Sequence, residues 1–291
     1  MTIVLSVMNF MKNKTVNKKL SYKVIMVPYV VWLAVFIVVP LALILGFSFT
    51  DLSGNFTFDN IINVGKYSNV FLNSIWLGFL STLICFILGY PMAYFISKID
   101  SSKQNIIIMV LMIPMWMSFL LRTYAWMTIL ENNGLLNSFL RTLGFNGLSL
   151  INTQGAIILG MVYNFIPYMV LQIYSVLIKI DNSLIEAAHD LGANRVMTFI
   201  KIIFPLSIPG VISGVTMVFV PAVSTFIISK MLGGGANLLI GDLIEMQFLG
   251  NTYNPNLGSA ISLFLIVLIL ICMGIMNQFD NDDSRDKNIV I

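Results

Sequence analysis

Charged residues are scarce in this sequence. Only 10% of the 291 residues are Asp, Glu, Lys or Arg, whereas 58% are hydrophobic and the mean hydropathy is +0.90. Soluble globular domains carry about 25% charged residues. The chain has too little charge to cover a surface that faces water on all sides. The composition therefore predicts a protein that crosses a membrane several times.

The residue types that build catalytic and metal sites are scarce too. There are two cysteines, Cys85 and Cys272, and one histidine, His189. The cysteines lie far apart inside hydrophobic runs, which predicts neither a disulfide framework nor a metal site. A single histidine cannot form a ligand cluster. The sequence also lacks the phosphate-binding pattern G-x-x-x-x-G-K-[ST]. We therefore expect no catalytic residue, no metal and no cofactor in this chain, and any energy from ATP must enter through another subunit.

Six long hydrophobic runs are candidates for membrane-spanning helices. A helix needs about 20 apolar residues to cross the hydrocarbon core. The runs cover residues 25–49, 70–96, 104–121, 155–178, 202–229 and 257–279, and none of them contains Asp, Glu, Lys or Arg. We predict an all-α membrane protein with six transmembrane helices over residues 25–279, between an N-terminal tail (1–24) and a C-terminal tail (280–291).

The distribution of basic residues predicts the orientation. If the N-terminus is cytoplasmic, twelve lysines and arginines lie inside and four lie outside. The inner set is Lys12, Lys14, Lys18, Lys19, Lys23, Lys98, Lys103, Lys179, Arg195, Lys201, Arg285 and Lys287, and the outer set is Lys66, Arg122, Arg141 and Lys230. Because cytoplasmic loops carry the excess of Lys and Arg, we predict that both tails are cytoplasmic in a multi-pass protein of the cell membrane.

Proline and glycine mark the helices that bend and pack closely. Eight of the nine prolines lie in or beside the first five runs, and proline kinks a helix. Kinked helices around a core are typical of a conduit that changes shape. The sixth run has no proline and predicts a straight helix. In the fifth run, Gly210 and Gly214 form a G-x-x-x-G spacing, which predicts the close approach of a second helix.

Charged residues return in a segment between the fourth and fifth runs. Ser183 and Glu186 match a capping box and predict a helix that runs from Ser183 to about Leu191. Gly192 is placed to end that helix in a left-handed conformation. Asn194 can start a second helix that continues into the fifth run. The segment therefore predicts two short helices joined by a tight turn on the cytoplasmic side.

This segment resembles the signature of the binding-protein-dependent ABC importer permeases. The signature reads E-A-A, three residues, G, nine residues, I-x-L-P, and the matching residues here are Glu186, Ala187, Ala188, Gly192, Ile202 and Pro205. Phe204 replaces the leucine of the pattern. The resemblance implies the type I, MetI-like permease fold. It also implies that residues 183–205 form a coupling segment, which docks on a cytoplasmic ATPase subunit through Glu186, Ala187, Ala188, Asp190 and Gly192.

The resemblance implies partners as well. Permeases of this family work with a second, similar permease, with two ATPase subunits that bind the ATP, and with an extracytoplasmic binding protein. Within the family the chain is similar to spermidine/putrescine permeases over most of its length after the N-terminal tail, and the matching stretches are residues 88–94, 113–116, 186–210, 237–241 and 247–249. This similarity implies a polyamine substrate and import by alternating access.

A polyamine site would need aromatic faces for cation–π contact and oxygen atoms for the ammonium groups. The aromatic candidates are Trp116, Tyr124, Trp126, Tyr163 and Tyr168, and the polar candidates are Asn164, Asp242 and Glu245. If the loop between the fifth and sixth runs is helical, its two acids share one face. Interfacial belts explain the aromatic residues equally well, and solvated loop charges explain the acids. For Arg122 a binding protein, a lipid headgroup and an acid of the protein all remain open as partners.

Three other functions compete with polyamine import, on unequal grounds. A permease of the same family for another small solute shares most of the pattern and is the main alternative. A secondary transporter driven by protons or sodium usually has ionisable residues at mid-membrane, and the six runs have none, although sodium sites built from carbonyls need none. An intramembrane enzyme would need a nucleophile with a base, or a metal cluster, inside the runs, and the runs contain no His, Asp, Glu or Lys.

Overall fold

The computed structural model describes residues 26–235, 237–250 and 252–286. Apart from an isolated bridge between Thr50 and Phe56, all the regular structure in this part of the chain is helical. The all-α prediction is therefore confirmed. The predicted N-terminal tail, residues 1–24, lies outside the described residues.

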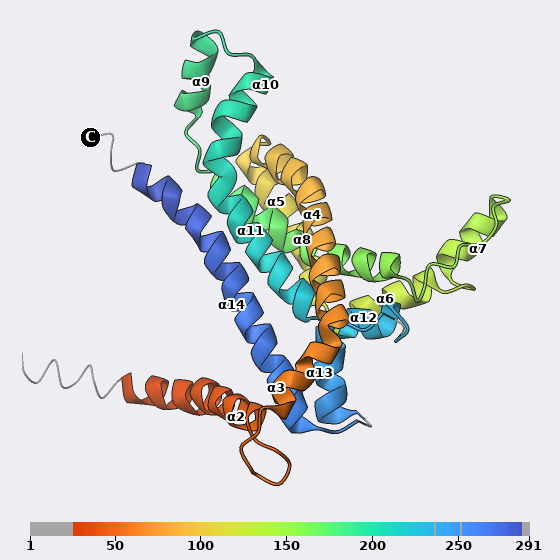
Figure 1. The fold of residues 1–291 in the computed structure, drawn as a ribbon. Coiled ribbons are helices and arrows are strands. Elements are labelled where there is room, and N and C mark those ends of the chain that lie inside the picture. The colour runs from red at the N-terminus through yellow and green to blue at the C-terminus, as the bar shows by residue number, and fades with distance from the viewer. Residues whose placement is uncertain (1–25, 236, 251, 287–291) are drawn as a thin grey trace, which may run out of the picture.

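The chain forms a series of long and short helices (Figure 1). A first helix, Met26–Ser48, contains the π-helical turn η1 (Ala34–Val38) and ends as α2 (Val39–Ser48). The following elements are α3 (Asp59–Val64), η2 (Gly65–Tyr67), α4 (Ser68–Ser97), α5 (Ser101–Trp116), α6 (Phe119–Leu130), α7 (Leu135–Thr142) and α8 (Gln154–Leu177). The remaining elements are α9 (Asn182–Asp190), α10 (Arg195–Thr198), η3 (Phe199–Ile203), α11 (Phe204–Ser224), α12 (Ile227–Leu232), α13 (Ile240–Leu249) and α14 (Pro255–Asp286).

Among the described residues, five helices are long and apolar enough to cross a membrane, and a bent pair gives a sixth candidate. The five are Met26–Ser48, Asp59–Ser97, Gln154–Leu177, Arg195–Ser224 and Pro255–Met276. The predicted multi-pass architecture is confirmed. The helix Gln154–Leu177 matches the fourth predicted run, residues 155–178, to within one residue at each end. α14 continues through Asp286, so the predicted C-terminal tail begins within this helix.

The third predicted span is not one straight helix. α5 ends at Trp116, Met117 and Ser118 are extended, and the helical segment from Phe119 leaves at an angle of 87°. Pro114 has no backbone N–H, so one hydrogen bond of this helix is missing. The last turn of α5 is tighter than an α-helical turn, because the Met117 amide donates to the Pro114 carbonyl, three residues earlier, at 3.2 Å. The predicted run over residues 104–121 is therefore a bent pair of helices, and the bend lies beside the proline that was expected to kink it.

The fifth predicted span also breaks, near the end that leads to α12. α11 ends at Ser224, Thr225 is extended, and a new short helix begins at Ile227. Pro221 removes one hydrogen bond from the last turns of α11, which weakens the helix just before the break. At the other end, the π-helical turn η3 ends at Ile203, two residues before Pro205, and accommodates the missing amide. A continuous helix through Ser229 is therefore wrong.

The core of the molecule is a bundle of α4, α8 and α11, which pack against one another along their lengths. Buried side chains from all three helices fill it, among them Leu77, Ile157, Met169 and Val218. Gly210 and Gly214 face α8, so the predicted close approach of a second helix is confirmed. α14 packs beside this bundle, against α2, α3, α11 and α13.

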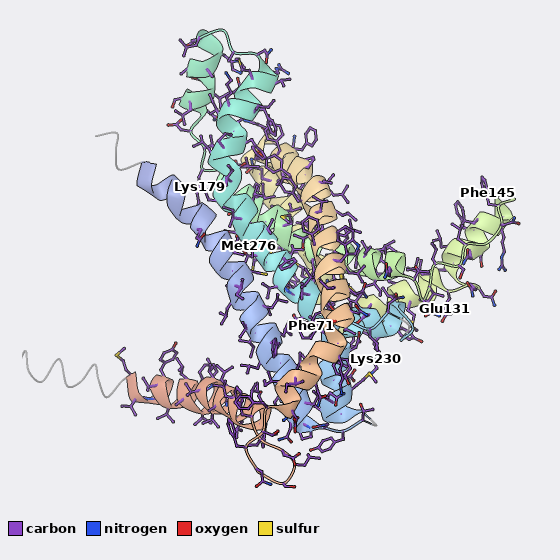
Figure 2. The ribbon with its side chains drawn as sticks, in the orientation of Figure 1. Phe71, Glu131, Phe145, Lys179, Lys230 and Met276 are labelled. Carbon is purple, nitrogen blue, oxygen red and sulfur yellow. The ribbon has the colours of Figure 1, made fainter. Side chains whose placement is uncertain are left out.

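The two ends of the bundle differ. The helices α9 and α10 project at one end, towards which α14 also runs, whereas α3, α12 and α13 lie at the opposite end (Figure 1). Figure 2 shows Lys179 on the side of α9 and Lys230 at the opposite end. The segment that resembles a coupling region and the acidic candidates Asp242 and Glu245 are therefore separated by the length of the bundle.

Candidate functional site

The helix α9 begins one residue earlier than the sequence predicted, and with a different cap. The carboxylate of Asp181 accepts a hydrogen bond from the Ser183 amide at 3.0 Å, so Asp181 is the N-cap. This bond lowers the pKa of the Asp181 carboxyl. The predicted capping box from Ser183 to Glu186 is wrong, because the Ser183 amide already lies inside the helix. The side chain of Glu186 is left exposed.

The turn after α9 has the predicted form. Gly192 is left-handed, with φ of 83°. Its amide donates to the backbone carbonyl of His189 at 2.9 Å, and the Ala193 amide donates to the backbone carbonyl of Ala188 at 2.9 Å. These two bonds make a Schellman motif. Asn194 then caps α10 by accepting from the Met197 amide at 2.8 Å, so both the predicted helix end and the predicted helix start are confirmed.

The hairpin of α9 and α10 exposes a mixed surface. Ala188 is buried within the fold, and Ile185 packs partly against the bundle core. The other coupling candidates, Glu186, Ala187, Asp190 and Gly192, are exposed. Exposed apolar side chains surround them: Leu184, Leu191, Val196 and Met197, of which Leu191 is 89% exposed. Apolar side chains gathered on an exposed, polar segment are typical of a protein-docking surface.

An aromatic cluster ties the hairpin to the bundle. Phe199, directly after α10, contacts the ring of Tyr94 at 5.3 Å and that of Tyr90 at 5.8 Å between centroids. Phe204 packs on Tyr90 at 5.7 Å, and the Tyr90 hydroxyl lies 2.8 Å from the Ser207 hydroxyl. Phe204 is the residue that departs from the family pattern, and here its ring completes this cluster. The sequence did not reveal the cluster, because its members come from distant parts of the chain.

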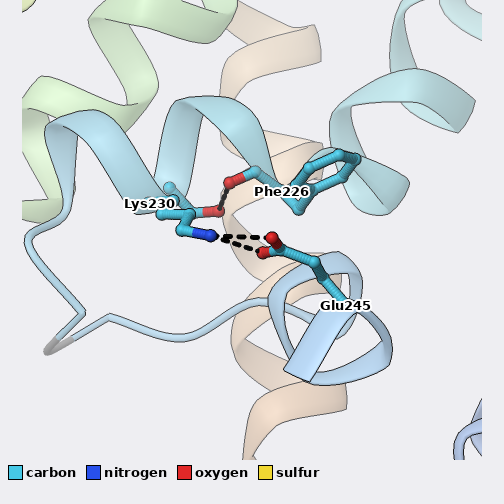
Figure 3. Close-up of polar contacts among 4 residues, drawn as sticks. Phe226, Lys230 and Glu245 are labelled. Carbon is cyan, nitrogen blue, oxygen red and sulfur yellow. Dashed lines mark hydrogen bonds and ion pairs between the residues drawn. The ribbon is translucent and has the colours of Figure 1, made fainter. Parts of the chain in front are cut away.

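The two acidic candidates lie on α13, so the loop that carries them is helical. Asp242 is buried, and its Oδ2 accepts a hydrogen bond from the Leu239 amide at 2.8 Å at the start of the helix. Burial raises the pKa of the Asp242 carboxyl. Glu245 pairs with Lys230, whose Nζ lies 2.7 and 2.9 Å from the two carboxylate oxygens (Figure 3). Lys230 was not among the candidates, because its partner lies 15 residues away.

Asp242 gives a test of how α13 is held. We expect Asp242→Ala to lower the free energy of unfolding by about 1 kcal/mol, because the Leu239 amide loses its acceptor. Asp242→Asn keeps an acceptor oxygen and removes the buried charge, so it should cost less. Thermal unfolding of the purified protein at pH 7 compares the two variants. Equal losses would show that the charge, not the hydrogen bond, holds the helix.

The same carboxyl gives a pH dependence with a definite sign. Its pKa is higher in the fold than in the unfolded chain. Its contribution to stability is therefore full below the ordinary aspartate pKa and is lost as the pH rises through the raised value. We expect Asp242→Asn to flatten this part of the pH profile of the melting temperature.

The aromatic candidates are not brought together at one place. Tyr163 packs edge-on against Trp126, with ring centroids 5.2 Å apart, and both line a shallow groove along α8 with Ile158. Trp116, Tyr124 and Tyr168 are exposed, and they make no ring–ring contact within the described part of the chain. The role of these three residues in a substrate pathway stays a prediction.

Two further polar candidates are buried. Asn164 donates to the Gly160 carbonyl at 2.8 Å, while its Oδ1 has no hydrogen-bond partner among the described residues. Arg122 is only 8% exposed, and its guanidinium carbon lies 5.8 Å from the Phe119 ring. Its Nε and Nη1 also have no partner in the described structure. Buried polar groups normally have hydrogen-bond partners. These atoms of Asn164 and Arg122 are therefore able to bond a further group.

Comparison with known proteins agrees with this geometry. Residues 86–282 match the model of the family described as binding-protein-dependent transport system inner membrane component. The chain is 37% identical over 270 residues to the spermidine/putrescine transport system permease protein PotB of Salmonella typhimurium (strain SL1344), covering 89% of this chain and 92% of that protein. It is 38% identical over 255 residues to PotB of Escherichia coli (strain K12), covering 84% and 91%.

Solved structures share the fold. A bacterial ABC transporter involved in the import of the acidic polysaccharide alginate contains a chain that superposes with a TM-score of 0.80 at 16% identity, covering 92% of this chain and 98% of that one. A chain of the MetNI methionine ABC transporter superposes with a TM-score of 0.54 at 17% identity, covering 73% and 93%. The predicted MetI-like permease fold is confirmed, and this chain belongs to the family of binding-protein-dependent transport system inner membrane components.

Proposed function

We propose that this chain is a permease subunit of an ATP-driven importer that moves polyamines, spermidine or putrescine, into the cytoplasm. The observation that carries the proposal is the identity of 37% over 89% of the chain to a spermidine/putrescine permease. The chain has no catalytic role of its own in this proposal. ATP is bound and hydrolysed by two separate ATPase subunits.

The exposed surface of the α9–α10 hairpin supports the docking of an ATPase subunit. Glu186, Ala187, Asp190 and Gly192 lie on it, with exposed apolar side chains beside them. Ala188 is buried inside the hairpin and would position the surface, not touch the partner. Movement of the hairpin would reach the bundle through Phe199 and the helix that continues into α11.

The remaining parts of the proposal follow from the same assembly. A second, homologous permease completes the pathway, and an extracytoplasmic polyamine-binding protein delivers the substrate. Both termini face the cytoplasm, which places α9 inside and α13 outside. Closure of the ATPase dimer would draw the two hairpins together and open the pathway outward, and hydrolysis would reset it.

Uptake of labelled spermidine into proteoliposomes tests the proposal. The vesicles would hold this chain with its partner permease and ATPase, and the binding protein would be supplied outside. We expect uptake only when ATP is present inside. If the binding protein stimulates ATP hydrolysis and spermidine stays outside, the substrate is another small solute. If no ATPase associates with the chain and an ion gradient drives uptake, a secondary transporter replaces the proposal.

A further inference from the structure

An ion pair joins the two short helices at the end of the bundle opposite the hairpin. Lys230 lies on α12 and Glu245 on α13, and the lysine Nζ bonds both carboxylate oxygens, at 2.7 and 2.9 Å (Figure 3). The two residues are 15 positions apart, across a loop with three consecutive glycines. The ion pair therefore links α12 and α13 directly.

The two partners are not equally exposed. The Glu245 side chain is 22% exposed, whereas that of Lys230 is 62% exposed. The carboxylate is thus fixed on the surface of α13, and the lysine reaches it from the solvent side on a flexible stem. Exposed ion pairs contribute little to stability. The lysine can therefore leave at small cost, and the carboxylate then remains in place for another cation.

The surroundings of Glu245 favour a cation. Asp242 lies one turn earlier on α13, is 4% exposed, and has a carboxylate oxygen with no hydrogen-bond partner in the described part of the chain. The charges of both Lys230 and Glu245 act on Asp242. The charge of one lysine thus acts on two acids, so a second ammonium group could take its place beside them.

The chemistry of the lysine suggests which cation that is. A lysine side chain ends in a primary ammonium on four methylene groups. Putrescine and the longer arm of spermidine end in the same aminobutyl group. The bond that the structure shows between Lys230 and Glu245 is therefore the bond that one end of such a substrate would make.

We propose that Glu245 binds a terminal ammonium of the entering polyamine, and that Lys230 holds this position until the substrate replaces it. The inference rests on the proposed function, because it needs a polyamine at the outer side. The exchange replaces one ammonium by another, so the carboxylate is never left unpaired. It also releases α12 from α13 when a cation of the right kind arrives.

Two single substitutions test the exchange because they should act in opposite directions. Spermidine uptake by the complete complex would be measured as an initial rate against the concentration of loaded binding protein. Glu245→Gln removes the binding carboxylate and should lower uptake efficiency by about tenfold or more. Lys230→Met removes the competing ammonium and should raise it. In the double variant the loss should equal that of Glu245→Gln alone.

Controls separate exchange from a structural role. Lys66→Met removes the same charge from an exposed site near the same end and should change nothing. A purely structural link predicts that Lys230→Met and Glu245→Gln lose uptake equally, and that the charge-swapped Lys230→Glu/Glu245→Lys variant recovers it. Either result overturns the exchange. Membrane level and ATPase association of each variant show whether it folds.

The inference and the proposed function fail in different ways. If the wild-type complex takes up spermidine but both single variants change uptake in the same direction or not at all, the exchange is wrong and the function stands. If the wild-type complex does not take up polyamines with ATP, the proposed function is wrong and the exchange falls with it.

Discussion

Replacing Glu186 with lysine should abolish ATP-driven uptake while the complex still inserts into the membrane. Glu186 is exposed on α9 and makes no ion pair within the described residues, so the reversal leaves the hairpin intact. The caps that hold the hairpin are Asp181 and Asn194, and neither is touched. Placing the wrong charge in a protein interface costs several kcal/mol, which corresponds to a loss of about 100-fold or more in docking affinity.

Co-purification with the ATPase and spermidine uptake would measure this effect. Asp100→Lys is a control for the change of charge, because Asp100 lies in an exposed turn between α4 and α5, outside the hairpin, and loses there only its exposed ion pair with Lys103. It should keep both ATPase binding and uptake. Glu186→Gln should give a smaller loss than the lysine variant. Normal uptake by Glu186→Lys would show that the ATPase does not dock on this surface.

The effect of the hairpin on the membrane helices depends on the residues behind it. Arg195–Ser224 is one continuous helical segment that passes from α10 through η3 into α11. Phe199 in its first turns packs on Tyr94 of α4. A force applied at α9 therefore reaches two helices of the central bundle, α11 through the chain and α4 through the aromatic cluster. The buried pair of hydroxyls on Tyr90 and Ser207 adds a polar contact between the same two helices.

The features that the sequence predicted correctly are decided by neighbouring residues. Gly192 ends α9 because a left-handed residue is needed there, and Asn194 starts α10 because its side chain reaches an amide three residues on. The fourth span depends only on a long apolar run. Such signals lie within a few residues of one another. They were sufficient to locate the hairpin, whereas its partner surface was implied by the resemblance to the family signature.

The features that were missed depend on contacts between distant residues. Lys230 looked like a solitary outer charge, because the bond to Glu245 exists only once α12 and α13 are folded side by side. The 87° bend after α5 was hidden inside an uninterrupted apolar run. Ser183 was predicted as the cap because its spacing to Glu186 matches a capping box. In the fold α9 already begins at Asn182, so Asp181 is the cap.

Close packing of α8 and α11 gives the second large expected effect. A Cβ atom at Gly210 would lie 3.0 Å from the backbone oxygen of Gln172 and 2.9 Å from the Cγ2 atom of Val176. The backbone oxygen cannot move aside without shifting α8. We therefore expect Gly210→Val to lower the free energy of unfolding by about 1–3 kcal/mol, the usual cost of overpacking. At Gly214 the nearest atom is the flexible Met169 sulfur, so Gly214→Ala should cost less.

Gly274→Val on α14 is the matched control for Gly210→Val. It makes the same change inside a long helix, at a position with no atom within 4 Å of an added Cβ. Thermal unfolding in detergent should therefore show a loss for Gly210→Val and little change for Gly274→Val. Uptake by Gly210→Val should fall as well, because in the proposed mechanism α11 would carry the movement of the hairpin, and a displaced α11 would no longer move with α8. If the two valine variants unfold at the same temperature and transport alike, the packing of α8 on α11 does not limit either property.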